Sequence, residues 1–248
     1  MLFQNTVFIG IDPPAGSESI TYAVIDKDRN LLALSRVDLN SLLAFIAGQQ
    51  SAVVAINSPR RPNQGLMADE AVRAGLNPNP SPGRWMNFRV AEYQLFQANL
   101  RIPHTPASPG ECPTWMQTGF SLYRKLAEFG FRDYKGENKT QMMLEVYPHA
   151  VFAALLERIP FKKKSLEGRL QRQLCLHAQD IAVPDPMKLF EEITRYRILQ
   201  GIMPLEKLFQ VENLEALAAA FTVWKTTLFP DQVTSIGDPR EGEIVIPV

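Results

Sequence analysis

The sequence predicts a mixed α/β fold, and three observations support this prediction. The first 37 residues contain three short apolar or alternating runs separated by turn-forming residues, which is the pattern of an antiparallel meander. An amphipathic segment then leads into a fourth apolar run, and a helix that crosses between strands suggests that the later strand runs parallel to the first. Beyond residue 148 the apolar residues recur mostly at helical spacing. We therefore expect a mixed five-stranded sheet with flanking helices and a largely helical C-terminal half.

Five segments are predicted to be strands because they are short, apolar and bounded by turn residues. The first ends in Asp12, the fourth is stopped by Pro59 just after Asn57, and the fifth has Glu145 near its end. In chain order the predicted strands are residues 6–12, 20–26, 30–37, 51–59 and 141–150.

Eight segments are predicted to be helical. The first has Asn40 and Ser41 available to cap its start. The segment from 58 to 84 is rich in Pro, Asn, Gly and Arg, and connections of that length are usually functional or mobile. The predicted helices span residues 39–50, 65–75, 88–100, 114–130, 148–157, 165–179, 186–197 and 211–228.

The composition limits the function classes. The chain has 26 basic and 26 acidic residues, so nothing in its net charge draws it toward nucleic acid or an anionic membrane. It contains no apolar stretch of roughly 18 residues, and we expect a soluble, cytoplasmic protein with no membrane partner.

Cys112 and Cys175 lie far apart and form no CxxC, which argues against a disulfide framework. Repeats, low-complexity segments and clean linkers are absent. We therefore predict a single domain over 1–248, with an inserted loop at about 58–84 and a helical elaboration at about 148–228.

Polar side chains lie at the ends of the predicted strands. Asp12, Asn57 and Glu145 end strands one, four and five, and Glu212 and Glu215 occupy successive turns of a late helix. If those three strands are parallel neighbours, their C-terminal ends converge on one crevice. Several carboxylates there would repel one another, and Mg²⁺ or Mn²⁺ is the usual remedy. A metal pair about 4 Å apart can hold both the attacking and the leaving oxygen of a phosphodiester.

Several motifs occur in an order that resembles a known family. They are GIDP, INSP, FRVAE, TGFSLYRKL, LEVYPHA, FKKKSLEGRLQRQ, LEALAAAFTVW and EGEIVIP. Over nearly the whole chain they resemble the domain-of-unknown-function family 429, whose members are described as predicted nucleases with a ribonuclease-H-like fold. The resemblance implies a mixed five-stranded sheet, with three antiparallel and two further parallel strands, and flanking helices. It also implies a nuclease or phosphodiesterase that depends on Mg²⁺ or Mn²⁺.

Under this resemblance Asp12 corresponds to the first-strand aspartate of the family and Glu145 to the glutamate of its EVYPH motif. Asn57 stands where an aspartate is expected, and Glu215 stands where the late helix usually offers aspartate. The predicted catalytic residues are Asp12, Asn57, Glu145 and Glu215, and the predicted metal ligands are Asp12, Glu145 and Glu215. Because Asn57 removes a charge from the site, a single-metal or degenerate site is an open alternative.

Each of these residues also has a structural interpretation. Asp12 is suited to bond the backbone of residues 14–16 in a turn, and Glu145 to cap the following helix. Glu215 would then lie on a solvated helix face, and Asn57 would bond the backbone where the chain leaves the sheet. His149 is a candidate proton carrier near the site, or simply a residue at a helix N-terminus.

Two basic clusters are candidates for binding phosphates, because neutralised phosphates release counterions. The predicted nucleic-acid-binding residues are Arg60, Arg61, Arg89, Lys162, Lys163, Lys164, Arg169 and Arg172. Trp85, Phe88 and Trp115 are candidates for base stacking. The competing interpretation is a solvated charged face beside aromatic residues of the core.

Three hypotheses follow. The first is a metal-dependent nuclease or phosphodiesterase. The second is a non-catalytic ribonuclease-H-like module that binds nucleic acid or a protein. The third is a nucleotide-dependent enzyme of the actin and sugar-kinase superfold, which also begins with a strand, an Asp and a Gly-containing turn. No HExxH, GxSxG or GxxxxGK[ST] motif occurs, which argues against the corresponding zinc, serine-hydrolase and P-loop chemistries.

Overall fold

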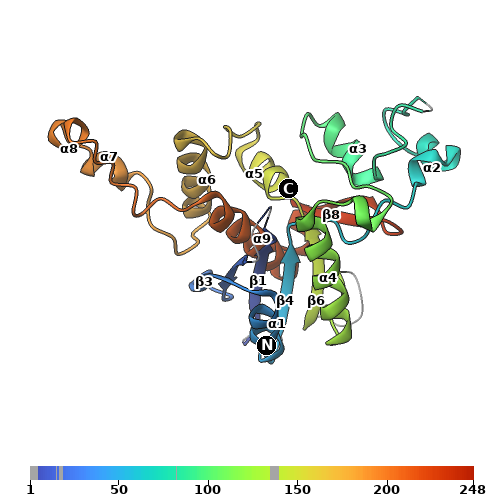
Figure 1. Cartoon of the computed structure of the whole chain (residues 1–248), viewed down its shortest axis with the longest axis horizontal. Coiled ribbons are helices and arrows are strands. Elements are labelled where there is room, and N and C mark those ends of the chain that lie inside the picture. Colours follow the sequence, from blue (N-terminus) through green and yellow to red (C-terminus); the bar gives the residue numbers. More distant parts are fainter. Residues whose placement is uncertain (1–4, 15, 17–18, 82, 135–139) are drawn as a thin grey trace.

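The computed structural model describes residues 5–248 apart from residues 15, 17–18, 82 and 135–139. Within these residues, eight strands form one mixed sheet in the order β3-β2-β1-β4-β6-β8-β7, and β5 pairs with β6 off this path. The strands are β1 (Val7–Asp12), β2 (Ile20–Ile25), β3 (Leu31–Val37), β4 (Ala52–Ile56), β5 (Arg132–Asp133), β6 (Gln141–Val146), β7 (Val233–Asp238) and β8 (Gly242–Pro247). Figure 1 shows the central strands β1, β4 and β6 side by side.

The five predicted strands are all present, and their directions agree with the prediction. β1, β2 and β3 form an antiparallel meander. β4 is parallel to β1, and β6 is parallel to β4. The prediction of a five-stranded sheet was nevertheless wrong, because β5, β7 and β8 extend the sheet beyond β6 to eight strands.

The two missed long strands form a C-terminal hairpin. β8 is parallel to β6, and β7 pairs antiparallel with β8. The alternating run in β7 and the apolar run in β8 flank a turn at residues 239–241, which is the usual sequence signal of a hairpin. The hairpin places the end of the chain at the middle of the molecule, close to the carboxyl ends of the central strands (Figure 1).

The helices cover both faces of the sheet. They are α1 (Leu39–Ala47), α2 (Glu70–Ala74), α3 (Val90–Gln97), α4 (Thr114–Glu128), α5 (Pro148–Leu156), α6 (Leu166–Ala178), α7 (Lys188–Glu192), α8 (Arg195–Leu199) and α9 (Val211–Leu228). The predicted helix at 186–197 is thus two short helices. The N-cap of α1 is Asp38, whose carboxylate accepts hydrogen bonds from the backbone of Asn40 and Ser41, so neither of the two predicted capping residues is the cap.

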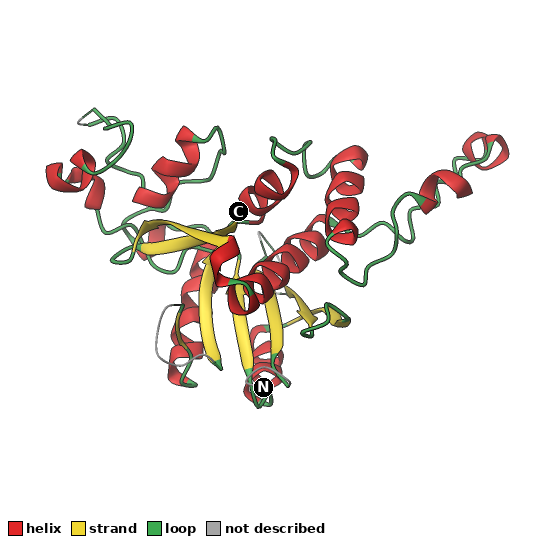
Figure 2. Cartoon of the chain, turned by 180° about the vertical axis from the view of Figure 1, so that it is seen from behind, coloured by secondary structure: helices red, strands yellow, loops and turns green. Residues whose placement is uncertain are grey.

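One face of the sheet packs on α9, α5 and α6. Phe8, Ala55 and Leu144 from three neighbouring strands lie in this cluster, together with the alanines of α9. Figure 2 shows α9 running across this face. The close approach depends on Gly10, because a Cβ at that position would overlap the backbone of α9 at Ala216 and Ala220.

The opposite face packs on α1 and α4. Ile11 of β1, Ile56 of β4 and Met143 of β6 lie in this second cluster, together with Leu42 and Leu122 of the two helices. Because side chains alternate along a strand, each central strand contributes odd positions to one cluster and even positions to the other. This alternation decides on which side of the sheet each predicted site residue lies.

Two parts of the chain extend away from the sheet. The helices α2 and α3 cover the β7–β8 end, and the pair α7–α8 projects as an arm from the opposite end (Figure 1). No helix among the described residues is long and apolar enough to cross a membrane.

Candidate functional site

Three of the four predicted catalytic residues converge. Asp12 is the last residue of β1, and Asn57 follows the last residue of the parallel strand β4. The backbone N–H of Asn57 donates to the backbone carbonyl of Ile11 at 2.9 Å. This bond continues the ladder between β1 and β4 and places Asn57 beside Asp12. Glu215 comes from the first turns of α9, which packs over this end of β1.

The contacts between these side chains are direct. The Asn57 Nδ2 group donates to Asp12 Oδ1 at 2.7 Å and lies 3.4 Å from Glu215 Oε2. Lys163 Nζ donates to Glu215 Oε1 at 2.8 Å. Asp12 and Glu215 are buried, with 7% and 6% of their surfaces exposed. Two buried carboxylates therefore share one amide, with a single ammonium group at the rim.

The electrostatics of this group follow from burial and like charge. Burial, and next the negative charge of Glu215, raise the pKa of Asp12 well above its usual value, although the Asn57 hydrogen bond and Lys163 act in the opposite direction. Burial of Glu215 excludes the structural interpretation that placed it on a solvated helix face. Glu212, one turn earlier, is exposed and lies 3.8 Å from Arg36. The competing turn role of Asp12 involves residues 14–16, of which residue 15 lies outside the described part of the chain.

The N-terminus of α5 lies near this acidic group. Burial, and next the charge of Glu215, raise the pKa of Tyr147, whose hydroxyl donates to the carbonyl of Arg101 at 2.6 Å. Burial, followed by Arg172 and Lys163, lowers the pKa of His149 to about 4. A neutral imidazole with so low a pKa is a weak proton acceptor, which argues against the predicted proton-carrier role for His149.

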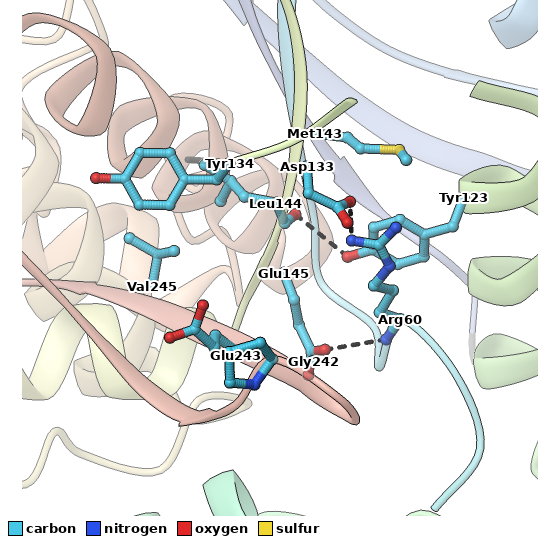
Figure 3. A pocket seen from close by; sticks show the side chains of 11 residues that line it. Arg60, Tyr123, Asp133, Tyr134, Met143, Leu144, Glu145, Gly242, Glu243 and Val245 are labelled. Atoms are coloured by element: carbon cyan, nitrogen blue, oxygen red, sulfur yellow. Dashed lines mark hydrogen bonds and ion pairs between the residues drawn. The ribbon is translucent and has the colours of Figure 1, made fainter. Parts of the chain in front are cut away.

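The structure does not bring Glu145 to this group. Glu145 pairs with Ile56 across the β4–β6 ladder, so its side chain lies on the face covered by α4, opposite to Asp12. There it binds the guanidinium group of Arg89 through both oxygens, one of them at 2.5 Å from NH2 and the other at 3.0 Å from NH1. The backbone N–H of Arg60 also donates to Glu145 at 2.9 Å (Figure 3).

Glu145 therefore binds the backbone at Arg60, in the segment that follows β4. It does not cap α5, which was its expected structural role. Together with residues of β5, β6 and β8, Glu145 lines a cavity of about 100 Å³, whose lining residues are drawn in Figure 3. The Arg60 guanidinium lies near the Tyr123 ring in this cavity and pairs with Asp133. Burial, followed by the charge of Glu145, raises the pKa of Tyr123.

Glu145 belongs to a buried network of ion pairs and hydrogen bonds. Arg89 is fully buried and binds Glu92 as well as Glu145, and Glu92 in turn accepts hydrogen bonds from Thr105. Glu241, in the turn between β7 and β8, accepts from the backbone N–H groups of three residues in the 64–90 region. The FRVAE motif is therefore bound to β6 through Glu145 and to the β7–β8 turn through Glu241, and the same two glutamates also hold the backbone at residues 60, 64 and 66. The sequence signal for this role was the Arg-x-x-Glu spacing at the start of a helix.

The predicted nucleic-acid-binding residues separate into buried and exposed members. Arg89 and Arg172 are 0% and 1% exposed, so neither has side-chain surface to offer a nucleic acid. Arg169 donates to the carbonyls of residues 208 and 209. The lysines 162–164 are exposed, and Arg60 and Arg61 are intermediate.

Of the three predicted stacking aromatics, one is buried, and Phe88 and Trp115 are intermediate in exposure. Trp85 is buried and contacts Phe88, Tyr93 and Phe96 in one aromatic cluster. Phe161, which was not among the predicted stacking residues, is 56% exposed and directly precedes the three lysines.

The donor set of the site suits one hard cation. Asp12 and Glu215 offer carboxylate oxygens, and a 180° rotation of the Asn57 amide would present its carbonyl oxygen in place of its NH₂ group. The like charge that raises the pKa of Asp12 is the repulsion that a divalent cation relieves. Among the described residues, no group of three or more His, Cys, Asp and Glu side chains is placed to hold a metal.

The fold and this group of residues define an α/β protein whose mixed sheet carries a buried acidic site at the carboxyl ends of its parallel strands. The chain belongs to the family described as protein of unknown function DUF429, whose model matches residues 3–241. No curated protein matches the chain.

Proposed function

We propose that the chain is a metal-dependent hydrolase of phosphodiester bonds in nucleic acid, centred on Asp12, Asn57 and Glu215. The observation that carries this proposal is the convergence of three oxygen-bearing side chains from β1, the end of β4 and α9 within hydrogen-bond distance of one another. Buried carboxylates whose charges repel are rare outside functional sites, because the protein loses stability by holding them together.

The sheet order supports a ribonuclease-H-like fold for the central part of the chain. Strands β3, β2, β1, β4 and β6 are neighbours in that order, with an antiparallel meander followed by two parallel strands. This is the arrangement that the resemblance implied, and β8 and β7 extend it at one edge. The positions of Asp12 and Glu215 on the first strand and a late helix agree with that expectation.

The proposal assigns Mg²⁺ or Mn²⁺ to Asp12, Glu215 and the Asn57 carbonyl oxygen. When bound, the cation supplies Lewis-acid stabilisation of a phosphoryl oxygen and lowers the pKa of water. Burial of the two carboxylates limits their contact with water and strengthens the attraction between the ionised groups and a cation. Lys163, at 2.8 Å from Glu215, is positioned to stabilise negative charge on a phosphate that approaches this rim. Glu145 positions the exit of β4 through the Arg60 N–H and so helps to orient Asn57.

The test is Mn²⁺ and Mg²⁺ titration calorimetry on the wild type and on Asp12→Asn, Asn57→Asp and Glu212→Gln, together with cleavage assays on labelled nucleic acids. We expect the wild type to bind Mn²⁺ and to cleave in its presence. Asp12→Asn should bind at least about tenfold more weakly, because it removes a charged ligand. Asn57→Asp should bind more tightly, because it adds a carboxylate.

Glu212→Gln is the matched control, since Glu212 lies on the same helix but is exposed and outside the group. It should bind Mn²⁺ within about twofold of the wild type if only direct ligands matter. Absence of metal binding in both the wild type and Asn57→Asp would contradict the proposal.

A second candidate function is a non-catalytic module that binds nucleic acid or a protein. One observation favours it: the Asn57 NH₂ group and Lys163 already satisfy the carboxylates with hydrogen bonds. Metal binding by Asn57→Asp alone, with metal-independent ligand binding by the wild type, would support this second candidate over the first.

A further inference from the structure

The loop between α5 and α6 combines exposed apolar and basic side chains next to the acidic site. Phe161 is 56% exposed and Ile159 is 53% exposed. The three following lysines, 162–164, are exposed as well. Single exposed apolar side chains are common on protein surfaces, so what distinguishes this loop is the run of three lysines that directly follows Phe161.

The backbone of this loop is held firmly although its side chains are exposed. The Phe161 N–H donates to Gln171 Oε1 at 2.8 Å, and the Phe161 carbonyl accepts from Arg172 NH1 at 2.9 Å. Arg172 is 1% exposed, so a buried guanidinium group is used to fix this one carbonyl and that of Gly168. Gly168 lies so close to the Lys162 carbonyl that a Cβ there would overlap it. The loop therefore presents Phe161 in a fixed position.

Lys163 connects this loop to the acidic site through its 2.8 Å contact with Glu215. Lys162 and Lys164 flank it, and in the described part of the chain neither forms a salt bridge. A ligand that reaches Lys162 and Lys164 would therefore contact the chain segment that is tied to Glu215 through Lys163.

We infer that the 159–165 loop is a docking site for single-stranded nucleic acid, with a base stacked on Phe161 and phosphates on Lys162 and Lys164. An exposed aromatic ring on a hydrogen-bonded backbone, followed by lysines, matches an unpaired base with its flanking phosphates. A duplex keeps its bases stacked on one another, so it cannot use the ring. This inference rests on the proposed function, because it supplies the substrate class for the same site.

The test is fluorescence anisotropy with the full chain in EDTA, which measures binding without cleavage. The probes are a labelled 15-residue oligo(dT), an oligo(U) of the same length and a labelled duplex. We expect both single strands to bind more tightly than the duplex. Phe161→Ala should weaken single-strand binding by about tenfold or more, and Phe161→Tyr should restore it, because tyrosine also stacks.

Phe190→Ala is the matched control, because Phe190 is 55% exposed but lies on the α7–α8 arm. It should leave the affinity unchanged. A Lys162→Ala/Lys164→Ala variant should reduce the slope of log K against log salt by about 1.4, since each phosphate contact on a single strand contributes about 0.7.

Three results would overturn the inference: equal affinity for duplex and single strands, a Phe161→Ala variant as tight as the wild type, or no binding at all. The outcome is separable from the proposed hydrolase activity. Binding that depends on Phe161 without any metal-dependent cleavage would retain the docking site and reject the hydrolase. Metal-dependent cleavage together with an affinity that does not depend on Phe161 would support the hydrolase and reject the docking site.

Discussion

At the scale of single residues, the site is governed by an amide that lies between two carboxylates. Asn57 donates to Asp12 and lies within 3.4 Å of Glu215, so its NH₂ group relieves part of their repulsion. An aspartate in its place would add charge where burial already raises the pKa of Asp12. The identity of residue 57 thus determines how strongly the carboxylates repel one another and how much a bound cation would stabilise them.

Asn57→Asp should lower the free energy of unfolding by about 1–2 kcal/mol in EDTA, because it adds a third negative charge to a buried group. Mn²⁺ should recover this loss by binding to the folded state. Urea denaturation with and without Mn²⁺ measures both effects. If the free energy of unfolding of Asn57→Asp is the same with and without Mn²⁺, the three side chains do not form a cation site.

Arg89 is the second residue with a large expected effect. It is fully buried between Glu92 and Glu145, and its removal leaves two carboxylates without their partner. Arg89→Met should lower the free energy of unfolding by about 3–5 kcal/mol, measured by urea denaturation. Arg124→Met, on the exposed face of α4, is the control and should change stability by less than about 0.5 kcal/mol. Equal effects of the two changes would contradict a buried structural network.

His149 predicts a pH dependence. Burial, with Arg172 and Lys163, lowers its pKa from 6.5 to about 4. Between pH 6.5 and about 4, His149 is protonated in the unfolded chain but neutral in the folded protein. Protonation therefore favours the unfolded state, and the free energy of unfolding decreases as the pH falls through this range. Relative to His149→Gln, the wild type should lose on the order of 1 kcal/mol over this range, after allowance for solvent screening. Parallel pH–stability profiles for the two proteins would exclude this assignment.

At the scale of elements, the packing of α9 on β1 brings Glu215 to Asp12. Gly10 has no side chain, and the facing residues of α9 are alanines, so the helix and the strand approach closely. Periodicity predicted the strand and the helix separately, within one or two residues of their observed ends. Their close contact was not predicted, because it depends on how two distant segments pack.

Gly10→Ala should therefore destabilise the protein by at least about 2 kcal/mol, because the added methyl group would overlap the α9 backbone. Gly48→Ala is the control. Gly48 follows α1 with φ −74°, and a Cβ there would meet only ordinary contacts at 3.5 Å and beyond. Thermal denaturation of both variants, with Mn²⁺ affinity measured in parallel, tests whether the contact also positions Glu215. A Gly10→Ala protein as stable as the control would contradict the close packing.

At the scale of the whole molecule, the central sheet is covered on both faces while the α7–α8 arm projects from it (Figures 1 and 2). Phe190, Tyr196 and Leu199 of the arm are 55%, 72% and 75% exposed. Such segments open locally at low free energy, unlike the buried strands.

Brief digestion with chymotrypsin should cut first within residues 187–202, and mass spectrometry of the fragments identifies the site. The fixed backbone at Phe161 should protect that residue although its exposure is similar. A first cut at Phe161 would contradict the rigid loop on which the single-strand docking site depends.

The sequence by itself determined the five core strands, most of the helices, the positions of Asp12 and Asn57 at strand ends and that of Glu215 early in a late helix, because these depend on local periodicity and turn residues. Tertiary structure decided which side of the sheet each side chain occupies. Glu145 and Asp12 are 133 residues apart in sequence, and only the register of β1, β4 and β6 shows that they face opposite ways. It also decided that Arg89 is buried and that Lys163 pairs with Glu215. A charged side chain's partner depends on contacts between distant segments, and local sequence carries little information about them.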